Sequence, residues 1–316
     1  MSPSGPALEA RAPAKINLCL HVTGRRADGY HLLDSLVVFA DADAADRVTV
    51  MLADNDRLAV TGPETAALGT GNDTDNLAAK ARDWLRAQIH AGAGPVAIGL
   101  EKNLPVASGI GGGSADAGAT LRLLARLWKV EAAIGAGRFD TMCSALGADI
   151  AMCVHGGALR ARGIGERIEP VDELPALPSV LVNPRIAVAT PSVFAALETR
   201  NNAPIPSLPS GGFADPAALA DWLTANTRND LAPPARALVP AIDAVLGALE
   251  ASGTLMARMS GSGATCFGLF ATRQHALDAA ETMAGAWPDW WIRPTVLNAG
   301  ISSNNRKSIG AAHVEA

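Results

Sequence analysis

The sequence has no surplus of basic residues. It carries 26 lysines and arginines against 31 aspartates and glutamates, for a formal net charge of −5. The chain contains no run of lysine and arginine. A general nucleic-acid binder, in contrast, presents a basic patch. The composition therefore predicts no nucleic-acid partner.

Long apolar runs and an N-terminal signal segment are also absent. Apolar stretches such as 95–100 fall far short of the ~20 residues that a membrane-spanning helix needs. The first ten residues lack the basic and apolar regions of a signal peptide. We expect a cytoplasmic protein with no membrane partner.

Cysteine is scarce, and no two cysteines form a Cys-x-x-Cys pair, so neither a zinc knuckle nor a redox motif is indicated. The four are Cys19, Cys143, Cys153 and Cys266. We expect them to be buried, reduced thiols.

The chain is long enough for about two domains of ordinary size. Its 316 residues are 49% hydrophobic and 18% charged, unlike the charge-rich, apolar-poor composition of disordered chains. We therefore expect a folded α+β protein with a substantial core.

The first half shows one clear strand. Ile16 and Leu18 alternate with Lys15 and Asn17, a pattern that predicts a half-buried strand over 15–22 with both polar side chains on one face. The other expected elements are strands at 47–52 and 95–101, a loop at 71–76, a helix from 77 to about 89, and a helix directly after the glycines at 109–113, capped by Ser114.

The second half predicts a split βαβ sandwich with helices on one face of its sheet. The expected elements are strands at 179–182, 255–259, 265–270 and 291–297, a loop at 201–212, and helices at 238–249 and 274–286, the first begun by Pro240 and ended by Gly253. Residues 298–316 are expected to form a mobile tail.

The strongest local signal is the segment Pro105-Val-Ala-Ser-Gly-Ile-Gly-Gly-Gly-Ser114 between a strand and a helix. Glycines let a backbone approach an anion, and a helix N-terminus attracts phosphate. The segment matches neither the Walker sequence, because Gly-Lys occurs nowhere in the chain, nor the dinucleotide fingerprint, because Ser114 stands where its third glycine belongs. A plain glycine turn is the alternative.

Three further clusters each have a structural alternative. The first, at 13–31, contains Lys15 and Asn17, and it could be a solvated strand face. Gly147-Ala-Asp149 could be a loop carboxylate or a helix cap, and Ser260-Gly-Ser-Gly-Ala-Thr265 could be a tight hairpin turn.

The order of these clusters resembles that of the GHMP small-molecule kinases. The motifs are Pro-Ala-Lys-Ile-Asn at 13–17, the glycine loop, Gly-Ala-Asp at 147–149 and the late Ser-Gly-Ser-Gly turn. Within that superfamily, Gly-Arg-Arg-Ala-Asp-Gly-Tyr-His at 24–31 and Asn-Asp-Leu at 229–231 are similar to the branch that acts on a cytidyl substrate. The match spans residues 12 to about 297.

The resemblance implies two domains with the active site between them. An ATP-holding domain at 11–165 is expected to precede a ferredoxin-like domain at 166–300, with a mobile tail at 301–316. The implied reaction is ATP-dependent phosphorylation of the 2-hydroxyl of 4-diphosphocytidyl-2-C-methyl-D-erythritol in non-mevalonate isoprenoid biosynthesis. ATP with Mg²⁺ is the implied cofactor, and the partners are small molecules.

The resemblance also implies roles for individual residues. Lys15 and Asp149 correspond to the catalytic pair. The implied substrate-binding residues are Asn17, Tyr30, His31, Thr190 and Phe194. The implied ATP-binding residues are Asn76, Lys102, Pro105, Val106, Ala107, Ser108, Gly109, Ile110, Gly111, Gly112, Gly113, Ser114 and Ala115.

The loop departs from the family pattern at two positions. Ala115 replaces the usual second serine, which removes one hydroxyl contact to phosphate or metal, and Ser108 stands where Ala or Gly is usual. The sequence therefore names no metal ligands. Two other functions stay open: a GHMP kinase of the homoserine or mevalonate type, and a catalytically silent nucleotide-binding protein of the same fold.

Overall fold

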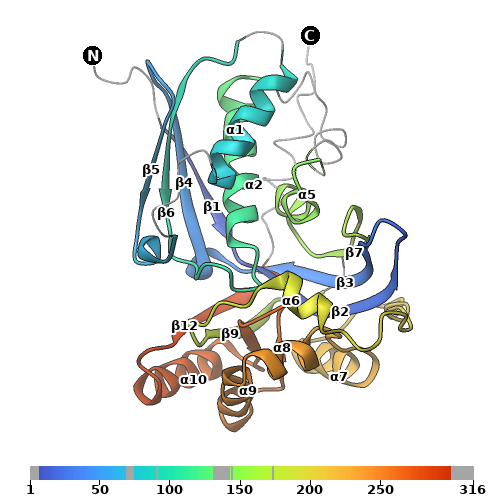
Figure 1. Cartoon of the computed structure of the whole chain (residues 1–316). Helices are drawn as coiled ribbons and strands as arrows, with labels where there is room; N and C mark the ends of the chain where they lie inside the picture. The colour runs from blue at the N-terminus through green and yellow to red at the C-terminus, as the bar shows by residue number, and fades with distance from the viewer. Residues whose placement is uncertain are drawn as a thin grey trace.

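Three four-stranded sheets make up the framework of the protein in the computed structural model (Figure 1). The structure describes residues 7–68, 75–89, 92–130, 143, 145–172 and 174–299. The expected tail at 301–316 and most of the expected loop at 71–76 lie outside the described residues.

The first sheet carries helices on one face and contains the strands β1, β4, β6 and β5 in the order β1-β4-β6-β5. The strands are β1 (Leu8–Pro13), β4 (Ala45–Leu52), β5 (Arg57–Thr61) and β6 (Val96–Glu101), with the short helices η1 (Ala42–Ala44) and η2 (Thr65–Leu68) beside them. The helices are α1 (Leu77–Gln88) and α2 (Gly112–Leu127). Asn76 caps α1 by accepting a hydrogen bond from the Ala78 amide at 2.9 Å.

The second sheet lies in the middle of the molecule and has the order β2-β3-β7-β8. Its strands are β2 (Lys15–Arg25), β3 (His31–Phe39), β7 (Leu159–Gly163) and β8 (Arg167–Pro170), and α5 (Ala148–His155) precedes β7. Because β8 pairs with β7, this sheet extends past residue 165 to Pro170. The domain division at 165 stays a prediction.

The third sheet has the order β10-β11-β9-β12, with every neighbouring pair antiparallel. This is the order of the expected ferredoxin-like sandwich, and most helices of this half lie below the sheet in Figure 1. Its elements are β9 (Leu177–Asn183), α6 (Thr190–Ala195), α7 (Pro216–Asn226), α8 (Ala232–Leu238), α9 (Ala241–Ala251), β10 (Met256–Met259), β11 (Cys266–Leu269), α10 (Arg273–Ala286) and β12 (Trp291–Leu297).

The predicted strands and helices of both halves are confirmed, with one change near residue 238. Leu238 ends α8, and Pro240 occupies the N-cap position of α9. The single helix expected at 238–249 is therefore two helices. No single described helix is long and apolar enough to cross a membrane; α8 and α9 reach the required length and composition only together, across a bend of 117°.

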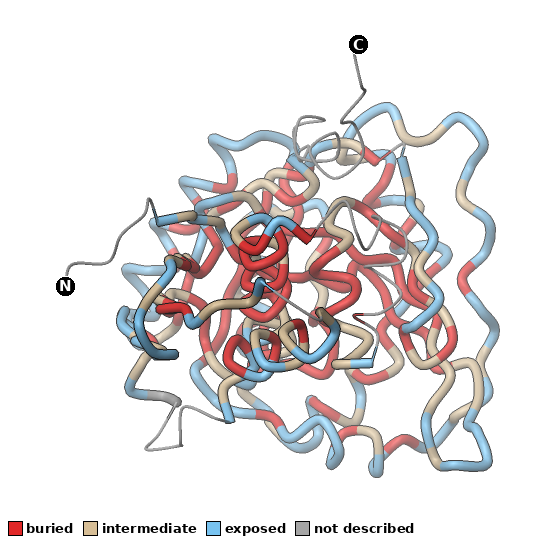
Figure 2. Tube along the Cα trace, turned by 90° about the horizontal axis from the view of Figure 1, so that it is seen from above, coloured by how far each residue is buried: buried red, intermediate tan, exposed pale blue. Residues whose placement is uncertain are grey.

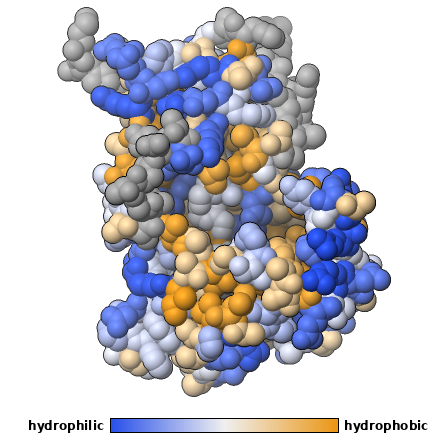
Figure 3. Space-filling model, viewed as in Figure 1, coloured by the Kyte–Doolittle hydropathy of each residue, from blue (hydrophilic) through white to orange (hydrophobic). Residues whose placement is uncertain are grey.

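Buried residues gather in the middle of the molecule and on both flanking layers (Figure 2). One core cluster joins the two halves, because it contains Ile16 and Leu36 of the middle sheet and Leu181, Phe267 and Trp291 of the third sheet. Figure 3 shows apolar surface on the lower, C-terminal half. All four cysteines are buried, as expected.

Candidate active site

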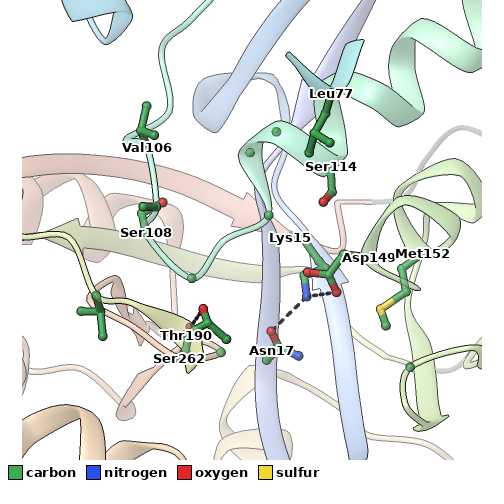
Figure 4. Close-up of a pocket in the computed structure, with 18 of the residues that line it drawn as sticks. Lys15, Asn17, Leu77, Val106, Ser108, Ser114, Asp149, Met152, Thr190 and Ser262 are labelled. Atoms are coloured by element: carbon green, nitrogen blue, oxygen red, sulfur yellow. Dashed lines mark hydrogen bonds and ion pairs between the residues drawn. The ribbon is translucent and has the colours of Figure 1, made fainter. Parts of the chain in front are cut away.

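A buried lysine and a half-exposed aspartate meet at the centre of the molecule. Lys15 begins β2, and Asp149 lies in the first turn of α5. The Lys15 Nζ donates to the Asp149 Oδ1 at 2.9 Å, as the dashed line in Figure 4 marks. The lysine side chain is 6% exposed and the aspartate side chain 47%. The pair therefore presents mainly its carboxylate to the surrounding cleft.

Asn17 lies beside this pair and is fixed by several hydrogen bonds. Its Oδ1 accepts from the Lys15 Nζ at 3.3 Å, and its Nδ2 donates to the Ser35 Oγ at 2.7 Å. Its backbone amide donates to the Ser260 Oγ at 3.1 Å. Lys15 and Asn17 are both buried, so the interpretation of this face as a solvated strand surface is wrong.

The glycine loop between β6 and α2 is held by bonds from both halves of the chain. The Lys15 amide donates to the Ile110 carbonyl at 2.9 Å, and the Thr265 amide donates to the Ser108 carbonyl at 3.1 Å. A Cβ on Gly109 would lie 2.6 Å from the Gly263 carbonyl oxygen. The turn at 260–263 therefore packs directly against the loop, in addition to joining two strands.

The start of α2 supplies free backbone amides. Gly111 is its N-cap, with a φ of 64°, and no side chain caps the helix. The expectation that Ser114 caps it is wrong, because the helix begins two residues earlier, at Gly112. The side chain of Ser114 extends instead toward the Lys15–Asp149 pair (Figure 4). Uncapped amides at a helix N-terminus form a binding site for phosphate.

Two residues that depart from the family loop have structural roles. The Ser108 Oγ donates to the Pro105 carbonyl at 2.6 Å, which closes the loop's own turn. Ala115 is buried in the core of the N-terminal half, and Ile110 is buried in the core cluster that joins the halves. Any contact that Ile110 and Ala115 make with ATP must come from their backbone.

Lys102 lies beneath the start of α2 between two carboxylates. Its Nζ donates to the Asp116 Oδ2 at 2.7 Å and also to Asp46. Burial by itself would lower the pKa of Lys102, but Asp116 and Asp46 outweigh burial and raise that pKa. Burial is also the main cause that raises the pKa of Asp116. The ammonium of Lys102 therefore stays charged inside the protein.

A cleft of about 670 Å³ contains these groups. It is lined by both residues of the Lys15–Asp149 pair, by Asn17, by Asn76 and Lys102, and by the glycine loop; of the predicted ATP-binding residues, only Ile110 and Ala115 do not line it. Thr190 and Ser262 close the side formed by the C-terminal half, where their hydroxyls lie 2.8 Å apart.

A second pocket of about 720 Å³ adjoins the cleft and shares Thr190 and Phe194 with it. Tyr30 and His31 line this pocket, and the rings of His31 and Phe194 stack with centroids 4.8 Å apart. Four of the five predicted substrate-binding residues thus line this pocket, whereas Asn17 lines only the cleft. Tyr30 is 62% exposed, so one face of the pocket is open to solvent.

His31 is set up as a neutral hydrogen-bonding group. Burial lowers its pKa, and the positive charges of Arg25 and Arg200 lower it further. The Nε2 of His31 is buried and has no hydrogen-bond partner among the described residues. A ligand in this pocket could satisfy that nitrogen.

Sequence reasoning missed the residues that support the site. Ser35 holds Asn17, and Asp46 and Asp116 hold Lys102. Ser35 lies on β3, a buried strand that the sequence interpretation left unassigned. The apolar run that surrounds Ser35 at residues 31–39 was the available signal.

Comparison with known proteins identifies the family. The family model for the GHMP kinases N terminal domain matches residues 76–157, and the model for GHMP kinases C terminal matches residues 206–289, together more than half of the chain. The chain belongs to the GHMP kinases.

Individual GHMP kinases match over nearly the whole chain. A 4-diphosphocytidyl-2-C-methyl-D-erythritol kinase of Rhizobium meliloti (strain 1021) is 50% identical over 92% of this chain and 95% of its own length. The kinase of the same name from Dinoroseobacter shibae is 51% identical, over 94% of this chain and 97% of its own.

Solved GHMP kinase structures agree in fold. A crystal structure of 4-(cytidine 5'-diphospho)-2C-methyl-D-erythritol kinase matches with a TM-score of 0.73 and 34% identity, covering 93% of this chain and all of that one. A homoserine kinase from Cytophaga hutchinsonii matches with a TM-score of 0.63 but only 19% identity. The second match shows the shared fold alone.

Proposed function

We propose that this GHMP kinase transfers the γ-phosphoryl group of ATP to the 2-hydroxyl of 4-diphosphocytidyl-2-C-methyl-D-erythritol, a step of non-mevalonate isoprenoid precursor biosynthesis. The observation that carries the proposal is the Lys15–Asp149 pair facing the glycine loop, in a cleft that opens into the pocket of Tyr30, His31 and Phe194. Relatives that are half identical and carry this activity in their names support it.

The chemistry of phosphoryl transfer suits this arrangement. The transition state is loose, so a kinase mainly positions the acceptor and stabilises charge on the phosphoryl oxygens. The uncapped amides of α2 and the glycine loop would hold the phosphates of ATP. Asn76 and Lys102 line the same cleft and would lie toward the base and ribose of the nucleotide.

Asp149 would accept the proton of the acceptor hydroxyl. Its Oδ1 is occupied by Lys15, and its Oδ2 makes no bond to a described residue. The free oxygen would take the 2-hydroxyl, while Asn17 would hold the substrate beside it. A general base of this kind contributes about 10²-fold to 10⁴-fold to the rate.

We include Mg²⁺ as a cofactor that arrives on the phosphates of ATP. Mg²⁺ in kinases keeps one or two protein carboxylates together with substrate phosphates. The described residues contain no cluster of three or more His, Cys, Asp and Glu, but the Asp149 carboxylate and the Ser114 hydroxyl both line the cleft and fit such a shared ion. The ion would neutralise charge on the phosphoryl oxygens.

The second pocket would select the cytidine. Tyr30 and Phe194 would stack on the base, and stacking contributes about 1 to 3 kcal/mol per contact in single-strand binders. His31 stacks on Phe194, and its unpartnered Nε2 would bond to a polar group of the ligand in the same pocket. We propose small-molecule partners only, and a cytoplasmic location.

The test is an assay of ADP release with the cytidyl substrate, homoserine and mevalonate offered in parallel. We expect turnover with the cytidyl substrate alone. Turnover with homoserine or mevalonate would favour the other kinase type, and absence of turnover with all three would favour the catalytically silent protein.

A further inference from the structure

A nearly inaccessible carboxylate lies between the two halves of the molecule. Glu64 is 3% exposed and follows β5 in the N-terminal half. A buried carboxylate without a partner costs several kcal/mol, so its environment must compensate it. Arg185 is its ion-pair partner among the described residues, and the Arg185 Nη1 donates to the Glu64 Oε2 at 2.9 Å.

Arg185 belongs to the other half and has an unfavourable backbone conformation. It follows β9, and its φ of 60° lies in the left-handed region, which costs a residue with a Cβ about 1 to 2 kcal/mol. Glycine would form this turn without that cost. The arginine is therefore used for its side chain, which reaches across to Glu64.

On the N-terminal side, Glu64 is attached to the start of the phosphate-binding region. The Glu64 amide donates to the Lys102 carbonyl at 3.1 Å, and the Lys102 amide donates to the Thr61 carbonyl at 2.7 Å. A Cβ on Gly62 would lie 2.4 Å from the Lys102 carbonyl oxygen. Residues 61–64 thus wrap around the backbone of a residue that lines the nucleotide side of the cleft.

On the C-terminal side, Arg185 is attached to the glycine loop. The Arg185 amide donates to the Asn183 Oδ1 at 2.7 Å, and the Asn183 Nδ2 donates to the Thr265 Oγ1 at 2.9 Å. The Thr265 amide then donates to the Ser108 carbonyl at 3.1 Å. The ion pair therefore links the two segments that hold the glycine loop at its beginning and at Ser108.

We propose that Glu64 and Arg185 are positioning residues for ATP: their ion pair holds the glycine loop between the two halves in the geometry that binds the phosphates. The inference rests on the proposed function. Neither residue lines the cleft or the cytidine pocket, so the pair acts through the loop. Loss of the ion pair should weaken ATP binding and leave the binding of the cytidyl substrate unchanged.

The test substitutes Arg185→Met and measures ATP affinity by calorimetry and the KM for both substrates. We expect ATP affinity to fall about 2-fold to 30-fold, the range found for residues that act through a contact network. The KM for the cytidyl substrate should stay unchanged. Adding Glu64→Gln to Arg185→Met should restore part of the ATP affinity, because the second change removes the uncompensated charge.

Arg273→Met is the matched control. Arg273 also pairs across the halves, with Asp43 at 2.9 Å, but both side chains are exposed, at 62% and 52%. Exposed ion pairs contribute little to stability. The ATP affinity of Arg273→Met should therefore match that of the unsubstituted protein. An equal loss in Arg185→Met and Arg273→Met would overturn the proposal, as would unchanged ATP affinity in folded Arg185→Met or an equal rise in both KM values.

Two milder variants keep the test decisive if Arg185→Met does not fold. Arg185→Lys should bind ATP more weakly than the unsubstituted protein, because a lysine cannot reproduce the guanidinium geometry, and Glu64→Gln should do the same. Unchanged ATP affinity in both overturns the inference. Failure of the unsubstituted protein to bind ATP or turn over the cytidyl substrate would instead contradict the proposed function.

Discussion

At the scale of single residues, the site combines a buried cation with an accessible carboxylate. Lys15 is buried, and its ammonium fixes one oxygen of Asp149 while the other faces the cleft. Asn17 and Ser35 fix the lysine side of the pair by hydrogen bonds within the middle sheet. The carboxylate is therefore oriented before any substrate binds, which is the condition for efficient proton acceptance.

Replacing Asp149 by Asn should abolish most turnover and spare ATP binding. The amide keeps the shape of the side chain but accepts a proton poorly, and the glycine loop is untouched. We expect kcat to fall by about 10²-fold to 10⁴-fold, with the calorimetric ATP affinity within about threefold of the original. A decrease in kcat of less than about tenfold would rule out Asp149 as the general base.

The lowered pKa of His31 predicts a pH dependence of cytidyl-substrate binding. A lowered pKa means that His31 is neutral above its ordinary value of 6.5, and that it protonates only as the pH falls below that value. The contribution of neutral His31 to the affinity for the cytidyl substrate should be complete above pH 6.5. It should be lost as the pH falls through the lowered pKa. Binding of the substrate should accordingly weaken in mild acid.

Calorimetric titrations between about pH 5 and pH 8, the range in which histidine titrates, can measure this dependence. His31→Gln is the control, because glutamine keeps a hydrogen-bonding group that does not titrate in this range. The variant should bind with an affinity that changes little with pH. The same acid dependence in both proteins would assign the effect to another group.

At the scale of elements, the glycine loop meets α2 at a residue with little space for a side chain. Gly111 has a φ of 64°, and a Cβ there would lie 3.2 Å from the Lys15 Cε. Gly111→Val should therefore distort the loop and displace Lys15 at the same time. We expect ATP affinity and kcat to fall together, each by at least about tenfold, as for the loss of about 1.4 kcal/mol.

Gly113→Ala, two residues away, is the comparison. A Cβ at position 113 would meet only the Leu77 Cδ1, at 3.3 Å, the far end of a flexible side chain. Alanine in a helix is favoured over glycine by roughly 0.5 to 1 kcal/mol, so this variant should fold at least as well. If Gly111→Val bound ATP as well as the unsubstituted protein does, the loop would be a structural turn with no phosphate-binding role.

The elements that could be predicted are those with strong local signals. The alternation in β2 and the glycine caps around α2 and α9 specify their elements from short stretches of sequence. β3 was missed because it is buried through most of its length and shows no alternation, and β5 because it is a short edge strand with weak apolar content. Local patterns do not report pairing between distant strands.

The same limit applied to the site. Lys15 and Asn17 could be placed on one face from spacing alone, whereas Asp149 lies 134 residues further along the chain from Lys15. Their pairing was expected only from the resemblance to the GHMP kinases. The burial of Asn17 depends on Ser35 and Ser260, which no local pattern connects.

At the scale of the whole molecule, the middle sheet belongs to both halves. Its apolar side chains share a core cluster with Leu181, Phe267 and Trp291 of the third sheet. Arg258, from β10, donates to the Leu18 carbonyl of β2 at 2.9 Å. The two halves that enclose the cleft therefore have no independent cores at their junction, which keeps the Lys15–Asp149 pair and the turn at 260–263 in fixed relation.

This shared core predicts that the two halves unfold as one unit. Phe267 is completely buried in it, and a buried Phe→Ala substitution costs about 3 to 5 kcal/mol. Phe267→Ala should lower the protection of slowly exchanging amides by the same free energy in α2 and in β9, as measured by hydrogen exchange. Leu255→Ala, at a residue 38% exposed, should leave the protection of both α2 and β9 unchanged. Loss of protection in β9 with α2 unaffected would show that the halves unfold separately, because the apolar side chains of α2 belong to the N-terminal core cluster and Phe267 to the cluster that joins the halves.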